Sequence, residues 1–261
     1  MKFYIVSRGD EFSNQIKEEL AARLSAAQLN MDKEEPDIAI SVGGDGTLLD
    51  TFHRYKHRLD KTAFLGIHTG HLGFYADWQP KELDELITHL TSKELKTVSY
   101  PLLEMVMALD DQSEERYLAL NECTVKTRSG SLVVTLEING DTFETFRGDG
   151  LCISTPSGST AYNKSLGGAI IHPSLCAIQI TEMASINNRV YRTIGSPLVL
   201  PAHHQCVLKP GNVSHYVVTV DHVTLEEKRV RKITLQVADE KIHFARYRPF
   251  PFWQRVKEAF I

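Results

Sequence analysis

The feature that most constrains this chain is a glycine-rich run, Gly43-Gly44-Asp45-Gly46-Thr47, that follows the apolar segment Ile38–Val42. The residues from Leu48 onward repeat with helical spacing, so the run joins a buried strand to a helix. Glycines let the backbone approach a bulky anion, and the N–H groups at a helix N-terminus attract it. A loop that only bound phosphate would not favour the negative charge of Asp45. The pattern therefore predicts a phosphate loop and favours phosphoryl transfer, with Asp45 in a chemical role.

The first hundred residues alternate strand and helix patterns, which predicts a Rossmann-like parallel sheet with helices on its faces, an α/β domain over residues 1–100. The strand patterns are Lys2–Ser7, Ile38–Val42 and Ala63–His68. The first helix is expected to carry Phe12, Ile16, Leu20 and Leu24 on one apolar face, since they are spaced four apart. Pro80 is expected to open a later helix.

Residues 101–246 are expected to form a β-rich, β-sandwich-like domain, and 247–261 an aromatic tail that packs back onto a domain. Asn139-Gly140 is a strong hairpin signal, and only Ser157–Leu166 has a helical pattern. The predicted strands are Leu102–Leu109, Arg116–Thr127, Leu132–Asn139, Thr142–Ser154, Ile178–Thr181, Tyr216–Asp221, Ile233–Val237 and Ile242–Tyr247.

Composition excludes several classes of protein. The 261 residues carry a net charge of −4, so no general basic field favours nucleic acid or an anionic membrane. No apolar run approaches the roughly 18 residues that a membrane-spanning helix needs. The N-terminus reads as a first strand rather than a signal peptide. The four cysteines are scattered without zinc spacing, which favours a reducing, cytoplasmic compartment.

A second polar run begins at Arg147-Gly148-Asp149-Gly150 and continues after a short apolar strand as Thr155-Pro156-Ser157-Gly158-Ser159-Thr160-Ala161-Tyr162-Asn163-Lys164-Ser165. Helix capping explains one or two of these hydroxyls but not the whole run. Together with Asp149, the run supplies a carboxylate, a phenol, an amide and an ammonium group. This inventory suits a large polar ligand.

Two other polar clusters have simpler explanations. His68 and His71 lack a third ligand of matching spacing, so no stable protein metal site is predicted, and the loop is expected to border a nucleotide with Phe74 and Tyr75 as walls. For Arg246, Arg248 and Arg255, ion pairing at the surface or a subunit contact is favoured over phosphate binding.

Four motifs in this order resemble the NAD kinase family, over almost the whole chain and closest to its short Gram-positive members. They are Gly43–Thr47, Asn121-Glu122, Gly148–Leu151 and Thr155–Tyr162. The first is also found in related form in 6-phosphofructokinases and lipid kinases. The last, with the Asn-Glu pair, is far more specific.

The resemblance implies ATP-dependent phosphorylation of the 2′-hydroxyl of the adenosine ribose of NAD, giving NADP, with a divalent metal such as magnesium carried on ATP. It implies Asp45 as proton acceptor, a phosphate loop of Gly43, Gly44, Gly46 and Thr47, and a homotetramer whose dinucleotide site is shared between subunits. The implied NAD-binding residues are Asp45, Gly46, Phe74, Tyr75, Asn121, Glu122, Arg147, Asp149, Ser157, Thr160, Ala161, Tyr162, Asn163, Lys164, Ser165, Ala184 and His222. His222 stands where many relatives carry an amide side chain.

Two alternatives remain open at the level of sequence. One is a kinase of the same superfamily that acts on a lipid or a sugar, although no obvious apolar entry for an acyl chain is present. The other is a dinucleotide-binding regulator without turnover, against which an intact Asp45 argues. The sequence does not distinguish ATP from other phosphoryl donors, decide whether NADH is accepted, or predict inhibition by NADP.

Overall fold

The computed structural model describes residues 1–92, 94–211, 216–225 and 229–261. The chain divides into two compact units. Unit 1 comprises Met1–Tyr100 and Glu240–Ile261, and unit 2 comprises Pro101–Asp239. Within the described ranges, no helix combines the length and apolar character needed to cross a membrane.

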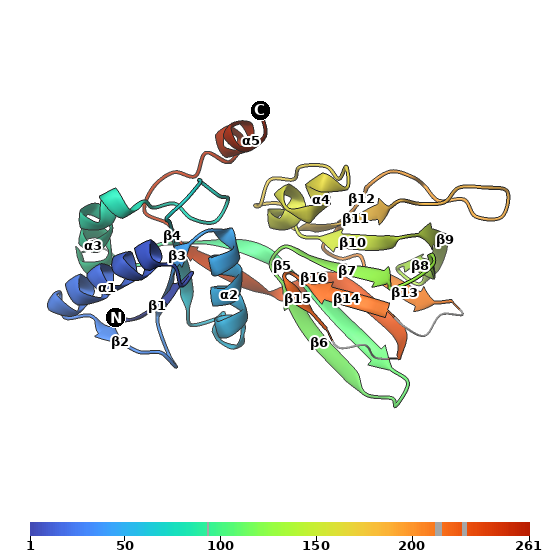
Figure 1. The fold of residues 1–261 in the computed structure, drawn as a ribbon. Coiled ribbons are helices and arrows are strands. Elements are labelled where there is room, and N and C mark those ends of the chain that lie inside the picture. The colour runs from blue at the N-terminus through green and yellow to red at the C-terminus, as the bar shows by residue number, and fades with distance from the viewer. Residues whose placement is uncertain (93, 212–215, 226–228) are drawn as a thin grey trace. The chain divides into compact units, whose positions relative to one another are not determined.

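Unit 1 is the α/β domain that the sequence predicts. Its strands follow the order β2-β1-β3-β4-β16 and pair in parallel. Helices α1 and α3 lie on one side of the sheet and α2 on the other (Figure 1). Helices on both faces explain why every residue of β3 and β4 is buried. The elements are β1 (Lys2–Ser7), α1 (Glu11–Ala26), β2 (Asn30–Met31), β3 (Ile38–Gly43), α2 (Asp45–Tyr55), η1 (Lys56–Arg58), β4 (Ala63–His68), η2 (Pro80–Glu82), α3 (Leu83–Ser92), the end of β16 (Val230–Ala245) and α5 (Phe252–Phe260).

The buried face of α1 differs from the expected apolar face at its first member. Ile16, Leu20 and Leu24 are buried, but Phe12 is 48% exposed, so the apolar face is buried only from Ile16 onward. Residues spaced four apart advance by about 40° more than a full turn at each step, which carries the first member off the buried stripe. Ser13 occupies that position instead and is fully buried.

Unit 2 is built from two β-layers, which agrees with the predicted sandwich-like domain. One layer is an antiparallel sheet in the order β12-β11-β10-β7-β14-β15. The other contains β16, β13, β8 and β9, with the β5–β6 hairpin beside them. The strands are β5 (Thr97–Leu109), β6 (Glu114–Ala119), β7 (Glu122–Thr127), β8 (Leu132–Ile138), β9 (Asp141–Gly148), β10 (Gly150–Ser154), β11 (Ala177–Met183), β12 (Leu198–Pro201), β13 (Cys206–Pro210), β14 (Tyr216–Val220), β15 (Val223–Thr224) and β16.

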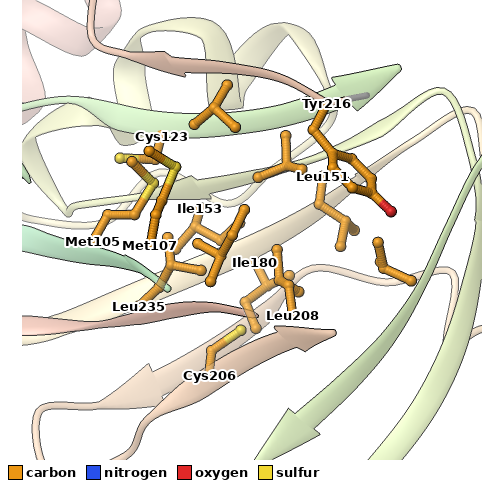
Figure 2. Packing of buried hydrophobic residues seen from close by; sticks show 14 of the residues in the cluster. Met105, Met107, Cys123, Leu151, Ile153, Ile180, Cys206, Leu208, Tyr216 and Leu235 are labelled. Atoms are coloured by element: carbon orange, nitrogen blue, oxygen red, sulfur yellow. The ribbon is translucent and has the colours of Figure 1, made fainter. Parts of the chain in front are cut away.

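The core of unit 2 lies between these layers (Figure 2). Leu151, Ile153 and Ile180 point into it from the first layer. Met105, Leu208 and Leu235 meet them from the second. The residues are buried because alternate side chains of each strand face the opposite layer.

Three predicted strand boundaries were wrong. Thr142–Ser154 is two strands, because the chain leaves one layer after β9 and enters the other at β10. Arg116–Thr127 is also two strands, β6 and β7, which lie in different layers. Ile233–Val237 and Ile242–Tyr247 belong instead to one strand, β16, so residues 240–246 lie in unit 1 rather than in the second domain.

Short elements were the least predictable. The strands β12 and β13 were not expected, since each has only four or five residues and ends in proline. The helical pattern of Ser157–Leu166 forms a 3-10 turn, η3 (Ser157–Thr160), and the single-turn helix α4 (Tyr162–Ser165).

Candidate active site

The strand–turn–helix arrangement predicted for the glycine run is confirmed, with β3 ending at Gly43 and α2 beginning at Asp45. Gly44 is the N-cap residue of the helix and makes no side-chain cap hydrogen bond. A Cβ on Gly43 would overlap the buried side chain of Thr47, which explains this glycine by close packing. Gly46 is exposed and has open space where a Cβ would be. The helix N-terminus therefore offers N–H groups and a positive dipole end to an anion.

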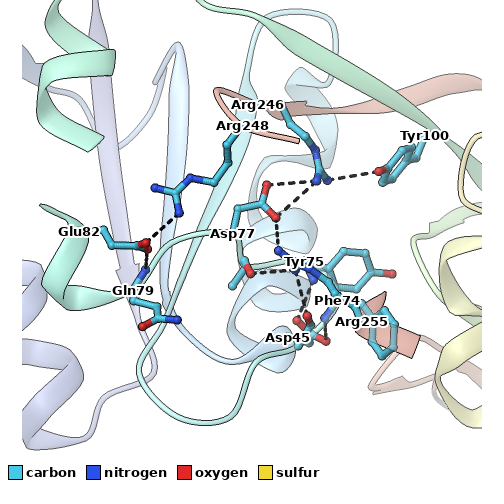
Figure 3. A network of polar contacts seen from close by, with 12 residues as sticks. Asp45, Phe74, Tyr75, Asp77, Gln79, Glu82, Tyr100, Arg246, Arg248 and Arg255 are labelled. Carbon is cyan, nitrogen blue, oxygen red and sulfur yellow. Dashed lines mark hydrogen bonds and ion pairs between the residues drawn. The ribbon is translucent and has the colours of Figure 1, made fainter. Parts of the chain in front are cut away.

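Asp45 lies at this helix start with both carboxylate oxygens bonded to backbone amides. Oδ2 accepts from the N–H of Phe74 at 2.8 Å, and Oδ1 accepts from the N–H of Tyr75 at 3.1 Å (Figure 3). Burial raises the pKa of Asp45, while these two bonds and the charges of Arg255 and His68 oppose the rise. Each carboxylate oxygen can accept a further hydrogen bond, so Asp45 can still accept a hydroxyl proton.

The strand register explains why a loop distant in sequence reaches Asp45. Gly43 pairs with His68, so β3 and β4 end side by side and their following loops leave from the same edge of the sheet. Ligands of parallel sheets bind outside this carboxyl edge.

Gly73, directly before Phe74, also packs against the carboxylate of Asp45. A Cβ on Gly73 would overlap the Asp45 carboxylate, so only glycine fits there without displacement.

The rings of Phe74 and Tyr75, predicted as nucleotide walls, pack against other aromatic side chains. Tyr75 is 5% exposed, and its ring stacks on Phe244 with 5.7 Å between centroids. The Phe74 ring contacts Phe252 and Phe260 of the tail, at 6.2 and 5.8 Å. The backbone of these two residues binds Asp45, and the role of their rings as nucleotide walls stays a prediction.

In unit 2 the predicted Asn121-Glu122 pair lies directly against the second glycine-rich run. The N–H of Thr155 donates to the carbonyl of Asn121 at 2.8 Å. A Cβ on Gly158 would overlap the backbone of Asn121. The two motifs, more than 30 residues apart, thus form one structure.

Asp221 holds the chain at this pair. Its carboxylate accepts from the N–H groups of Leu120, Asn121 and Glu122 at 3.0, 2.7 and 3.2 Å. Three amide donors satisfy the carboxylate at the point where β6 gives way to β7.

Glu122 is buried, and its Oε2 atom has no hydrogen-bond partner among the described residues. Burial, followed by the nearby charge of Asp221, raises the pKa of Glu122 to about 8. A protonated Glu122 could both donate and accept a hydrogen bond, as recognition of a purine edge requires.

A cavity of about 530 Å³ in unit 2 brings together four predicted residues, Asp149, Tyr162, Ser165 and Ala184. A volume of this size fits a small-molecule ligand. Asp149 is exposed at the break between β9 and β10, and its N–H donates to the carbonyl of Met183 at 2.9 Å. The remaining lining residues are Lys126, Thr127, Gly130, Leu166, Glu182 and Met183.

Tyr162 is held at the cavity by Lys126. Lys126 Nζ donates to the Tyr162 hydroxyl at 3.1 Å and lies 4.7 Å from the centre of the ring. The predicted ligand-facing position of Tyr162 therefore coincides with a cavity wall.

Several predicted residues do not line this cavity. Asn163 is fully buried and accepts from the hydroxyl of Thr181 at 2.6 Å, which makes its side chain part of the framework. The Arg147 guanidinium lies over the Tyr191 ring at 5.1 Å. Ser157 and Thr160 are buried in η3, Ala161 is half-buried, and Lys164 and His222 are exposed.

Comparison with known proteins gives the same result for both halves of the chain. Residues 7–95 match the ATP-NAD kinase N-terminal domain, and residues 120–247 match the ATP-NAD kinase C-terminal domain. The chain belongs to the NAD kinase family.

The sequence similarity to relatives from Bacillus and neighbouring genera extends over the whole chain. NAD kinase 1 of Halalkalibacterium halodurans is 64% identical, with 100% of this chain and 99% of the relative covered. NAD kinase 1 of Bacillus subtilis is 61% identical, with 100% and 98% covered.

Two solved structures share the fold. Yeast NADH kinase complexed with NADH has a TM-score of 0.85 at 21% identity, covering 100% of this chain and 87% of that one. An NAD kinase from Archaeoglobus fulgidus in complex with ATP has a TM-score of 0.74 at 23% identity, covering 94% of each. At these identities the likeness shows the NAD kinase fold alone.

Three residues at these sites were not expected from the sequence: Asp221, Lys126 and Glu182. Asp221 belongs to no motif. The one sequence feature that could have indicated a role for it is its place in a turn directly before His222. Lys126 and Glu182 lie within strands, where their alternation with apolar residues reads as an ordinary solvent face.

The tail arginines form ion pairs, as expected, but two of them are not at the surface of the chain. Arg246 and Arg255 are each 8% exposed and share Asp77 (Figure 3). Arg248 is more exposed and pairs with Glu82 at 2.9 Å. Ion pairing at the surface was the wrong expectation for Arg246 and Arg255, because the tail folds back and α5 packs its Phe252 against the loop that carries Phe74.

The histidines of the loop after β4 have no metal-binding arrangement. Across the described ranges, no group of three or more His, Cys, Asp and Glu side chains could hold an ion. His68 is buried, with Nδ1 3.0 Å from the carbonyl oxygen of Gly70.

Proposed function

We propose that this chain catalyses ATP-dependent phosphorylation of NAD at the 2′-hydroxyl of its adenosine ribose, with NADP and ADP as products. Membership in the NAD kinase family supports the acceptor and the donor. The observation that supports the proposal is the position of Asp45. It lies at the start of α2, and the backbone amides of Phe74 and Tyr75 hold its carboxylate.

Asp45 acts on the proton of the attacking hydroxyl. The ribose 2′-oxygen forms a bond to the γ-phosphorus of ATP, the bond from that phosphorus to ADP breaks, and the hydroxyl proton passes to the Asp45 carboxylate. A carboxyl pKa near its usual value of ~4 makes a feeble base, and burial raises the pKa of Asp45 toward a better one. Because phosphoryl transfer has a loose transition state, the proton can leave late and positioning carries most of the rate.

The donor is the magnesium complex of ATP, which enters as a substrate. The first-turn N–H groups of α2 and the open backbone of Gly44 and Gly46 would face its phosphates. Gly43 and Thr47 shape the turn by packing against each other.

The dinucleotide would be held largely by unit 2. Asn121 and Glu122 would bind adenosine, and the cavity formed with Asp149, Tyr162, Ser165 and Ala184 would take a further part of NAD. Lys126 supports this role by orienting Tyr162.

Replacing the proposed proton acceptor tests the assignment. We expect Asp45→Asn to lower kcat by roughly 10²-fold or more, the range of a lost acid–base group, while NAD still binds. The measurement is NADP formation from NAD, ATP and magnesium, with NAD binding followed by calorimetry. Near-normal turnover by the variant would remove Asp45 from the mechanism. No NADP from the wild type, with tight NAD binding, would indicate a regulator or another donor.

Two further features belong to the proposal. We place the enzyme in the reducing cytoplasm, since its four cysteines form no disulfide. We also propose a homotetramer with a shared dinucleotide site. The segment after Ala184 exposes three apolar side chains that an assembly would cover, Ile186, Val190 and Ile194.

A further inference from the structure

The loop that binds Asp45 is itself bound by a residue of the C-terminal helix α5, Arg255. Phe74 and Tyr75, which donate their amides to Asp45, lie between Gly73 and Ala76 in the chain. Both flanking carbonyls accept from one atom, Nη1 of Arg255, each at 3.0 Å. One guanidinium therefore binds the chain on both sides of the two amide donors (Figure 3).

The same guanidinium is fixed by a buried ion pair. Arg255 Nη2 donates to Asp77 Oδ1 at 2.8 Å, and Arg246 Nη1 lies 3.2 Å from the other oxygen of that carboxylate. Asp77 directly follows the bracketed segment, so the fork of Arg255 reaches three acceptors within five residues, Gly73–Asp77. A planar guanidinium suits such a multidentate contact.

The helix α5 delivers Arg255 to this place. Phe252, one turn earlier, is 3% exposed, and its ring lies 6.2 Å from that of Phe74. The backbone N–H of Arg255 donates to Pro251 at 3.1 Å, in the first turn of α5. Phe252 and Arg255 of α5 thus contact the same short loop, Gly73–Asp77.

A phosphate-binding role for Arg255 fits these contacts poorly. Its side chain is nine-tenths buried, and its two terminal nitrogens donate to protein oxygens. Its guanidinium also lies over the ring of Phe250 at 4.5 Å.

We propose that Arg255 is a positioning residue for Asp45, acting through the carbonyls of Gly73 and Ala76 on the amides of Phe74 and Tyr75. This inference rests on the proposed role of Asp45 in phosphoryl transfer. Gly73 packs against the Asp45 carboxylate, so a shift of the loop moves or releases that carboxylate. The positive charge of Arg255 also favours the ionised form of Asp45.

A double-mutant cycle on the full-length enzyme tests the coupling. We expect Arg255→Met to lower kcat by about 10-fold to 100-fold and to change the KM for NAD and ATP less than about threefold, as misplacement of a reacting group does. In the Asp45→Asn background the same substitution should lower kcat no more than about threefold further, because the group it positions is already gone.

Arg248→Met is the matched control. Arg248 lies in the same tail and forms an ion pair with Glu82, and in the described part of the chain no hydrogen bond joins it to Gly73 or Ala76. We expect its kcat to stay within about twofold of the wild type. An equal loss in both single variants, or losses that multiply in the double variant, would overturn the role of Arg255 while leaving that of Asp45. Full turnover by Asp45→Asn would overturn both.

A spectroscopic readout covers the case in which Arg255→Met does not fold. Arg255→Lys keeps the charge but cannot span the three acceptors with one nitrogen. We expect the amide signals of Phe74 and Tyr75 to shift in a ¹⁵N-labelled Arg255→Lys enzyme and to stay in place in Arg248→Met. Unchanged amide signals in Arg255→Lys would contradict the proposal.

Discussion

Asp45 and the amides that hold it are close in space but 29 and 30 residues apart in the chain. The glycine run determines where the carboxylate starts, at the first position of α2. The loop after β4 determines where it points. The position of this carboxylate depends on the absence of a side chain at Gly73.

Gly73→Ala tests this dependence. The added methyl would overlap the Asp45 carboxylate, so we expect kcat to fall about 10-fold or more with a smaller effect on KM. Gly70→Ala in the same loop is the control, because its Cβ would meet no atom within 4 Å. Steady-state kinetics of both variants make the comparison, and equal activities would show that the carboxylate tolerates displacement.

Glu122 makes the stability of the folded chain depend on pH. Its pKa of about 8 in the folded chain lies above the ordinary glutamate pKa of 4.5, so the folded state binds its proton more tightly than the unfolded state does. Stability from this group is therefore greatest at low pH and falls as the pH rises from about 4.5 to about 8.

Glu122→Gln removes the titrating group while keeping its shape. We expect the variant to be more stable than the wild type at pH 9, and the difference to shrink toward pH 5, where folded Glu122 is protonated. Urea unfolding at pH 5, 7 and 9 measures this, with the exposed Glu18→Gln as control. A stability difference that does not vary with pH would contradict the assigned burial.

At the scale of elements, α5 is a nine-residue helix whose place is determined by a few side chains. Phe252 and Arg255 are buried, while Trp253 between them is 60% exposed. The helix is amphipathic, and its Phe252 and Arg255 both contact the loop that carries Phe74.

Phe252→Ala tests the anchoring of α5. Removal of a buried ring costs about 3 kcal/mol of unfolding free energy or more, and kcat should fall as the loop loosens. Trp253→Ala, at the next position, should cost less than about 1 kcal/mol. Chemical unfolding and turnover of both variants provide the test. A similar cost at both positions would mean that α5 is held by its backbone rather than by its buried face.

At the scale of the whole molecule, the chain has two cores in two units and passes between the units along β5 and β16. Unit 1 carries the proposed chemistry at Asp45, and unit 2 carries the cavity proposed for the dinucleotide. The exposed apolar side chains after Ala184 belong to unit 2.

The proposed tetramer can be tested by the mass of the protein in solution. Light scattering at micromolar concentration should give four times the mass of one 29.4 kDa chain. Val190→Asp places a charge on a side chain that is 80% exposed in the single chain. If an assembly covers it, the variant should dissociate and bind NAD more weakly. A stable monomer with full activity would contradict the shared site.

The sequence by itself determined the parts of this protein that depend on local pattern. Apolar spacing predicted the parallel strands and the β-rich half, and the order of glycine, hydroxyl and carboxylate motifs predicted the family. Steric demands of a turn and the dipole of a helix start are local, so residues such as Gly43 and Asp45 could be identified without a structure.

Only the tertiary structure decided which distant groups complete these motifs. The amides of Phe74 and Tyr75 at Asp45, the carboxylate of Asp221 at Asn121 and the grip of Arg255 on Gly73 all join segments far apart in the chain. Nor could local pattern show that Asn163 is framework rather than cavity wall. A hydrogen bond or a packing contact depends on the register of strands and the return of the tail, which no short stretch of sequence encodes.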